Sequence, residues 1–323
     1  MEKVIERTQN HSSPVREKFG VLGAKFNLGQ KREGVEQAID YLREYNLLPF
    51  LHHFFEDVVD YGDVRQDIPN TYVSDPQIIL SNMRRLYREC LSVLNKSDRA
   101  LFVGGDHSVG MATVAAVKSK YPDAIIIWMD AHADMNTPEQ SLTKSLHGMP
   151  MAFLTGIVDS PRYAGFSEFN GVLEPNDVIY LGLRDLDKAE VGNLKSLGVE
   201  AHSTISILKH GIAPLLQSSL QKIDPYGERP IHLSFDIDCL DPIWAPCTGV
   251  PAEEGLSLID VNEMSMILQK TGRLKSFDFV ELNPLLAQNR VQLTQSMRVL
   301  YHLIGGLFPY LDKYELGRTQ LLN

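Results

Sequence analysis

The sequence is poor in cysteine, in positive charge and in long apolar runs. Its 323 residues include three cysteines, whose spacing fits neither a disulfide framework nor a zinc ribbon: Cys90, Cys239 and Cys247. Scattered cysteines are typical of a reducing compartment, so we expect structural thiols and a cytoplasmic location. No apolar run approaches the roughly 18 residues that a transmembrane helix needs. The first 18 residues also lack the apolar core of a signal peptide.

The charge balance excludes further classes of partner. Asp and Glu outnumber Lys and Arg by 41 to 31, and the net charge of −10 argues against nucleic acid or an anionic membrane as the main partner. Hydrophobic residues make up 44% of the chain, as in ordinary globular proteins. No linker rich in Pro, Gly or Ser and no internal repeat divides the sequence. We therefore expect a loosely ordered tail over residues 1–18 and one large domain over 19–323.

Strand and helix patterns alternate along the chain. Short runs rich in β-branched and aromatic residues predict strands, and apolar positions at helical spacing predict the helices between them. The predicted strands cover 19–24, 58–61, 100–103, 124–129, 177–183, a stretch near 199, 230–235 and 274–280. The predicted helices begin at 34 and at Ser74, as an N-cap, and cover 108–119, 188–197, 213–223, 258–271 and 291–307. The alternation predicts an α/β fold: a doubly wound, largely parallel sheet with helices on both faces.

Polar residues follow several of these strands, where ligands bind in such a sheet. The clearest cluster, Asp130-Ala131-His132-Ala133-Asp134, comes directly after the apolar run 124–129. If the chain stays extended, its alternate side chains share one face, and three acceptors on one face favour a cation among them. The other interpretation of this stretch alone is an exposed acidic turn with an incidental histidine.

Similar clusters follow other strands, at 104–108, 185–187, 236–238 and 281. Taken singly, Gly-Gly-Asp-His-Ser could be a strand-to-helix turn with a capping serine, 236–238 a solvated turn, and His147 a packed loop histidine. Together at one edge of a sheet they predict a metal centre. Oxygen and imidazole without thiolate favour Mn²⁺, Mg²⁺ or Fe²⁺, and four carboxylates suit two divalent ions, which can activate a shared water as hydroxide. The candidate ligands are His107, Asp130, His132, Asp134, Asp236 and Asp238.

These segments resemble those of the arginase family of manganese-dependent ureohydrolases. The similarity runs from about residue 19 to 307, and LHGMP and LRDLD favour arginases over agmatinases and formimidoylglutamases within the family. The matching segments are GQKREGVEQA at 29–38, GGDHS at 104–108, DAHADMNTP at 130–138, LHGMP at 146–150, GLRDLD at 182–187, HLSFDIDCLDP at 232–242, TGVP at 248–251, KTG at 270–272 and VELNP at 280–284.

The resemblance implies a reaction and a role for each matching residue. It implies two Mn²⁺ per subunit on the six candidate ligands, and hydrolysis of L-arginine to L-ornithine and urea by a metal-bridging hydroxide, in arginine metabolism and the urea cycle. His147 is then the proton shuttle or general acid, Glu281 pairs with the substrate guanidinium, and Asp134 counts as catalytic as well as a ligand. The implied contacts of the substrate's amino and carboxylate groups are Asn136, Thr143, Ser145, Asp187 and Glu190.

Some positions depart from the family pattern. Thr143 and Ser145 stand where arginases usually present Ser and Asn toward the substrate carboxylate. Lys144 between them either supplies charge to that carboxylate or is a solvated loop lysine. Val250 replaces a Thr near the guanidinium, so one hydrogen bond is missing.

The resemblance also implies a homo-oligomer, a trimer in many arginases, although Ile259 and the tail after residue 307 replace residues that help those trimers form. Three other functions stay open. The substrate could be agmatine or another guanidino compound, the protein could bind metal with weak or lost catalysis, or it could be a metal-dependent phosphatase. Intact His147 and Glu281 argue against a pure binding role, because binding alone needs no proton shuttle.

Overall fold

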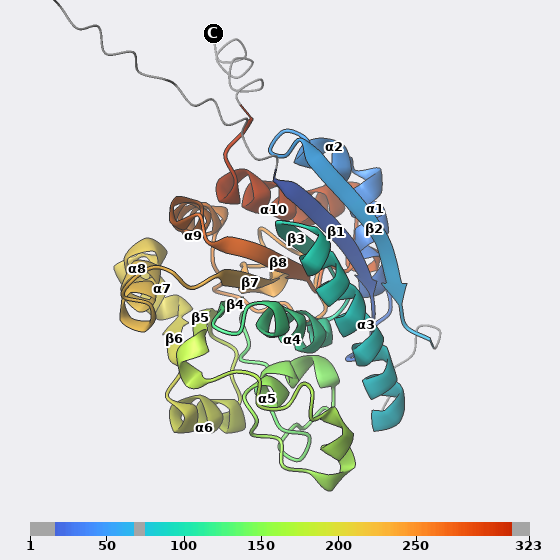
Figure 1. Ribbon diagram of the computed structural model, residues 1–323, viewed down its shortest axis with the longest axis vertical. Coiled ribbons are helices and arrows are strands. Elements are labelled where there is room, and N and C mark those ends of the chain that lie inside the picture. Colours follow the sequence, from blue (N-terminus) through green and yellow to red (C-terminus); the bar gives the residue numbers. More distant parts are fainter. Residues whose placement is uncertain (1–16, 68–74, 312–323) are drawn as a thin grey trace, which may run out of the picture.

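The computed structural model describes residues 17–67 and 75–311, so residues 1–16 of the predicted tail lie outside the described residues. Its centre is an eight-stranded sheet in the order β2-β1-β3-β8-β7-β4-β5-β6, in which every neighbouring pair is parallel (Figure 1). The predicted doubly wound α/β fold class is therefore confirmed. The strands are β1 (Lys18–Lys25), β2 (Asp57–Arg65), β3 (Arg99–Val103), β4 (Ile125–Met129), β5 (Val178–Leu183), β6 (Glu200–Ser203), β7 (Ile231–Asp236) and β8 (Leu274–Val280).

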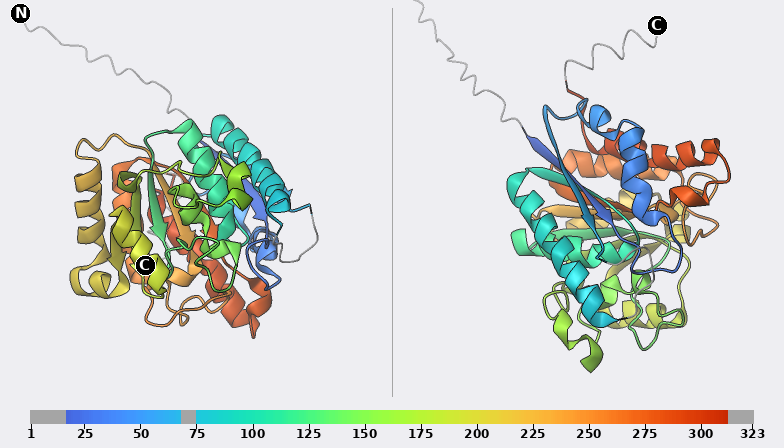
Figure 2. Two further views of the ribbon diagram at one scale, coloured as in Figure 1. Left: turned by 90° about the horizontal axis from the view of Figure 1, so that it is seen from below. Right: turned by 90° about the vertical axis from the view of Figure 1, so that its right-hand side faces the viewer.

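Helices cover both faces of the sheet and divide the core in two. One core cluster holds side chains of α1, α2 and α7 to α10, and the other holds side chains of α3 to α6. The right-hand view of Figure 2 shows α3 and α4 on one side of the sheet and α1, α9 and α10 on the other. The helices are α1 (Ala38–Glu44), α2 (Leu47–Leu51), α3 (Pro76–Lys96), α4 (Gly110–Lys120), α5 (Pro150–Leu154), α6 (Lys188–Leu197), α7 (Thr204–His210), α8 (Ile212–Ile223), α9 (Leu258–Thr271) and α10 (Arg290–Leu307).

Strand β4 shows why its apolar run is unbroken. Ile125, Ile127 and Met129 belong to one core cluster, while Ile126 and Trp128 belong to the other. All five side chains are fully buried. A strand buried on both faces needs apolar residues at every position, and each large side chain buried in this way contributes about 1.5–3 kcal/mol.

Three details differ from the predicted elements. The helix expected from residue 34 is interrupted between α1 and α2, where Asn46 adopts a left-handed backbone with φ of 67°. The N-cap of α3 is Asp75, whose carboxylate accepts from the amide of Gln77; the predicted cap, Ser74, lies outside the described residues. The short helices α5 and α7 were not predicted. Within 17–67 and 75–311, no helix combines the length and apolar character needed to cross a membrane.

Candidate metal centre and its cavity

The polar clusters gather at one edge of the sheet because their strands are neighbours. β3, β8, β7, β4 and β5 are consecutive in the sheet and all parallel. Their carboxyl ends therefore point the same way, and the residues that follow them meet there. The turn after β3 requires a glycine, because a Cβ on Gly105 would lie 1.7 Å from the carbonyl oxygen of Phe26.

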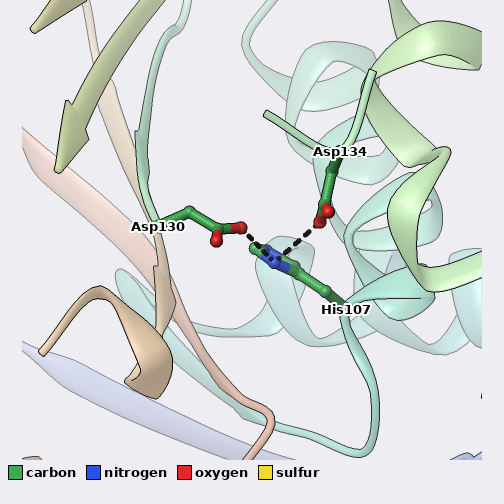
Figure 3. Close-up of side chains that lie close together, drawn as sticks. All are labelled: His107, Asp130 and Asp134. Atoms are coloured by element: carbon green, nitrogen blue, oxygen red, sulfur yellow. Dashed lines mark ion pairs between the residues drawn. The ribbon is translucent and has the colours of Figure 1, made fainter. Parts of the chain in front are cut away.

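One group of candidate ligands surrounds the imidazole of His107. Its Nδ1 lies 3.0 Å from a carboxylate oxygen of Asp130 and 3.1 Å from those of Asp134 and Asp236. Figure 3 shows the side chains of His107, from the turn after β3, and of Asp130 and Asp134, from the loop after β4, converging on one point. All four side chains are buried. Imidazole nitrogen and carboxylate oxygen at these distances can ligate one divalent cation.

A second group shares Asp130 with the first. Nδ1 of His132 lies 3.4 Å from Oδ1 of Asp130 and 3.2 Å from Oδ2 of Asp238. Nε2 of the same ring lies 3.5 Å from a carboxylate oxygen of Asp185. The structure thus brings all six predicted ligands together as two adjoining groups that share Asp130, with Asp236 placed in the first group by its contact with His107.

The backbone of the 130–134 loop is not extended as expected. Asp134 has a left-handed φ of 50°, a conformation that costs energy in any residue other than glycine. This turn sends the Asp134 carboxylate back to His107, while His132 faces Asp238. Convergence of the side chains was predicted correctly, but strand alternation was the wrong reason for it.

The electrostatics of the cluster calls for positive charge. Burial and the carboxylate of Asp238 raise the pKa of Asp236 well above its ordinary value. Burial and Asp130 raise the pKa of Asp134 to about 6. Burial would lower the pKa of His107, but the three carboxylates around it raise it well above its ordinary value. Buried carboxylates at such distances repel one another unless a cation or a proton lies between them.

Unsatisfied atoms also fit a bound cation. Among the described residues, Nδ1 of His107 and Oδ2 of Asp134 are buried without a hydrogen bond. Buried polar atoms rarely stay unsatisfied, because each costs about 1–3 kcal/mol. Since both atoms point at the same place, the donor set fits divalent cations of the Mn²⁺ type.

Residues behind the ligands fix their orientation, and the sequence did not single them out. Nε2 of His107 lies 2.9 Å from Oγ of Ser234, which donates to the buried carboxylate of Asp278 at 3.1 Å. The indole Nε1 of Trp128 donates to Asp130 at 3.0 Å. Such outer partners set the tautomer and direction of metal ligands. Because serine and tryptophan are ordinary in buried strands, no sequence signal marks them.

His147 and Glu281 form a pair beside the cluster. Nδ1 of His147 donates to Oε1 of Glu281 at 3.0 Å, and the amide of His107 donates to the same oxygen at 2.9 Å. Oε2 accepts from Nε2 of Gln30 at 2.7 Å. Gln30 lies in the matching segment 29–38, but no role in the site was predicted for it from the sequence. Burial would lower the pKa of His147, but its hydrogen bond with Glu281 raises it to about 9. Glu281 has a left-handed φ of 62°.

A cavity of about 280 Å³ opens onto both features. Its lining contains Asn136, Thr143, Asp187 and Glu190 of the predicted substrate contacts, but not Ser145. Ser141, Leu142 and Asp185, not predicted as contacts, also line it, and so does Val250. The lining further includes His107, His132, Asp134, His147, Gly148, Asp236, Asp238 and Glu281.

Several cavity residues also hold local structure. Asp187 is the N-cap of α6 and forms a capping box with Glu190. Oδ1 of Asp187 makes the cap, and its Oδ2 accepts from the side-chain amide of Asn136 at 2.9 Å. The ammonium of Lys144 donates to the carbonyl oxygens of Pro138 and Glu139, and Lys144 is not among the lining residues. This geometry favours a loop-stabilising lysine over a contact with the substrate carboxylate.

The fold and the cluster define a class: an α/β protein whose parallel sheet carries a candidate histidine and aspartate centre for divalent cations. The family model described as "Arginase family" matches residues 17–305. Arginase-1 of Sus scrofa is 35% identical over 297 residues, which cover 90% of this chain and 92% of that protein. The arginase of Neurospora crassa is 36% identical over 299 residues, which cover 85% of this chain and 83% of that protein. The crystal structure of arginase from Bacillus subtilis matches with a TM-score of 0.79 at 28% identity, and the match covers 90% of this chain and 99% of that one.

The chain belongs to the arginase family. It is a ureohydrolase with a candidate metal site, and its substrates are small guanidino compounds.

Proposed function

We infer that this ureohydrolase cleaves L-arginine to L-ornithine and urea. The observation that carries this proposal is the cavity itself, which joins the metal centre to two separate sets of carboxylates. Glu281 follows β8, whereas Asp187 and Glu190 follow β5, and the ligand-bearing strands β7 and β4 lie between them. A substrate with a guanidinium and an amino group can therefore place one cation near each set.

The residues of the chain have distinct tasks in this reaction. His107, Asp130, Asp134 and Asp236 would hold one Mn²⁺, and His132 and Asp238, with the shared Asp130, the other. Such ions act as Lewis acids and lower the pKa of bound water, which supplies a nucleophile near neutral pH. Glu281, already fixed by His147, the His107 amide and Gln30, holds the planar guanidinium in line.

His147 supplies the proton that the leaving amine needs. In the metal-free protein, the hydrogen bond with Glu281 raises the pKa of the His147 imidazole to about 9, which favours its protonated form. It lines the cavity and is hydrogen-bonded to Glu281, so it lies beside the group that the substrate must approach. A positioned imidazolium next to a departing nitrogen is a suitable general acid.

Agmatine is the second candidate because, among the described residues, those that line the cavity include acidic side chains but no lysine or arginine. Asp185, Asp187 and Glu190 suit an ammonium group, whereas a substrate carboxylate would depend on neutral donors such as Thr143 and Asn136. Arginine stays the preferred substrate of the proposal for two reasons. Its amino group can pair with the same acidic side chains, and its carboxylate can accept hydrogen bonds from these neutral donors.

Urea release measures the choice directly. Metal-free protein is loaded with Mn²⁺, and urea is followed with arginine and with agmatine. We expect arginine to give the larger kcat/KM, and Glu281→Gln and His147→Asn to lower it by at least about a hundredfold, the range found for positioned acid–base groups. A larger kcat/KM for agmatine would move the assignment to that substrate. No urea from either compound, with two metals bound, would overturn the proposal.

A further inference from the structure

The guanidinium of Arg184 binds the main chain of two segments at the carboxyl edge of the sheet. Arg184 directly follows β5 and is half-buried. Its side chain makes six hydrogen-bond contacts at 2.7–3.2 Å, all to main-chain carbonyl oxygens, and the three contacts of Nη2 share two N–H groups. The acceptors are Gly182, Asp238, Cys239, Leu240, Ala252 and Glu253.

Five of these carbonyls belong to one structural unit, formed by residues 238–241 and 252–256. The amide of Leu256 donates to Cys239 at 3.0 Å, and the amide of Asp241 donates to Leu256 at 2.9 Å. Gly255 packs so closely that a Cβ there would lie 2.2 Å from the amide nitrogen of Asp241. These contacts hold the two segments, Asp238 included, as one unit.

Arg184 joins this unit to the loop after β4. The amides of Arg184 and Asp185 both donate to the carbonyl oxygen of Ala131, at 2.9 and 3.1 Å. Ala131 lies between Asp130 and His132, and its own amide donates to the Asp238 carboxylate at 3.2 Å. Arg184 is thus fixed by its backbone to the loop that carries Asp130, His132 and Asp134, and by its side chain to the segment that carries Asp238.

We propose that Arg184 is a positioning residue that sets Asp238 against Asp130 and His132, and so determines the affinity of the second cation group. The inference rests on the proposed function only in assuming that each group holds one cation. Its physical basis is the shape of the side chain. A guanidinium offers five N–H donors in a rigid plane, whereas a lysine ammonium offers three on a flexible stem. Lysine at this position keeps the positive charge but cannot bind all of these carbonyls.

The test is a Mn²⁺ titration of metal-free Arg184→Lys by calorimetry, with electron paramagnetic resonance to separate single ions from spin-coupled pairs. We expect the dissociation constant of the second Mn²⁺ to rise at least about tenfold, the usual effect of losing an outer partner of a ligand. The first Mn²⁺ should bind within about threefold of its wild-type affinity. The spin-coupled signal at two equivalents should give way to that of single ions.

Arg229 provides a matched control at the other edge of the sheet. Its guanidinium also binds carbonyl oxygens, those of Asp123, Asn176 and Ile223, near the amino ends of β4 and β5. Arg229→Lys should lower the unfolding temperature without changing either Mn²⁺ affinity. A general loss of rigidity would affect the two variants alike.

Each outcome decides the proposal. Wild-type affinities for both ions in Arg184→Lys would overturn it. If that variant does not fold, Arg184→Gln is titrated in its place, with the same expectation. Failure of both variants to fold, while Arg229→Lys folds, would assign Arg184 to folding instead of metal positioning. A wild-type protein that binds two ions but releases no urea would overturn the proposed function and leave this titration fully interpretable.

Discussion

The imidazole of His107 stacks on the indole of Trp128, with ring centroids 4.0 Å apart and planes at 7°. The same indole donates to the Asp130 carboxylate at 3.0 Å. One buried aromatic side chain therefore holds two candidate ligands, one by stacking and one by a hydrogen bond. Its position in β4 makes the strand part of the metal centre as well as of the core.

Trp128→Phe separates these two effects. Phenylalanine keeps an aromatic ring beside His107 but removes the N–H that orients Asp130, so we expect Mn²⁺ affinity to fall by about tenfold or more. The lost volume should also lower the unfolding temperature. Trp244, 38% exposed, is the matched position, and Trp244→Phe should leave metal binding unchanged. Equal Mn²⁺ affinity in the two variants would contradict a role for the indole N–H.

Gln30→Leu tests how Glu281 is held. Leucine has a similar size but cannot donate to Oε2, which loses a buried, charge-assisted hydrogen bond worth about 1.5–3 kcal/mol. Glu281 should then be less well placed for the guanidinium, and kcat/KM for arginine should fall by about 10- to 100-fold, mainly through KM. Steady-state urea release gives both constants. An unchanged KM would show that His147 and the His107 amide position the carboxylate without Gln30.

Gly105→Ala should be severely destabilising. The added Cβ would lie 1.7 Å from the Phe26 carbonyl oxygen, and neither backbone segment can move without breaking sheet contacts. A cost above about 4 kcal/mol, visible as insoluble protein or a large fall in denaturation midpoint, is expected. Gly192→Ala is the opposite case: it lies inside α6, nothing lies within 4 Å of its Cβ position, and alanine there should stabilise by about 0.5–1 kcal/mol.

Metal removal should destabilise the whole protein. Four buried aspartates converge on the centre, and a cation that binds only the folded chain adds its binding free energy to stability, about 2.7 kcal/mol at 100 times its dissociation constant. Thermal unfolding should shift upward with Mn²⁺ and downward after chelation. Asp236→Asn with Asp238→Asn should abolish the Mn²⁺ response. A melting temperature independent of Mn²⁺ in the wild type would argue against a site at these residues.

The sequence predicted most of the fold because its strands are strongly marked. The run before Asp130 was predicted as a strand buried on both faces, which β4 confirms, and α6 and α9 have the predicted bounds of 188–197 and 258–271. The helix after residue 34 was predicted less well, since nothing in its apolar spacing shows that Asn46 turns left-handed. Helices of five to seven residues such as α5 and α7 contain too few turns to show a period.

For the site, the sequence could predict that the candidate ligands converge, but not which residues hold them in place. Polar residues after parallel strands must meet at one edge, so the six candidate ligands could be grouped from the sequence. Gln30, Ser234 and Arg184 all lie in segments that resemble the family, but their contacts depend on neighbours far along the chain, which those segments do not reveal. Ser145 was expected to line the cavity, but only Thr143 of the two does so. The amide of Ser145 donates to Oγ1 of Thr143, a local turn that the residue types alone did not indicate.

Asp134 and Glu281 occupy backbone conformations that glycine would adopt without strain, yet both present carboxylates to the centre. Selection for a robust fold alone would favour glycine or asparagine there, and selection for chemistry forbids it. At these two positions the protein therefore carries a local cost in stability that its chemistry requires. Engineering for heat resistance should leave them alone and turn first to Glu254, an exposed residue of the same backbone type whose side chain does not line the cavity.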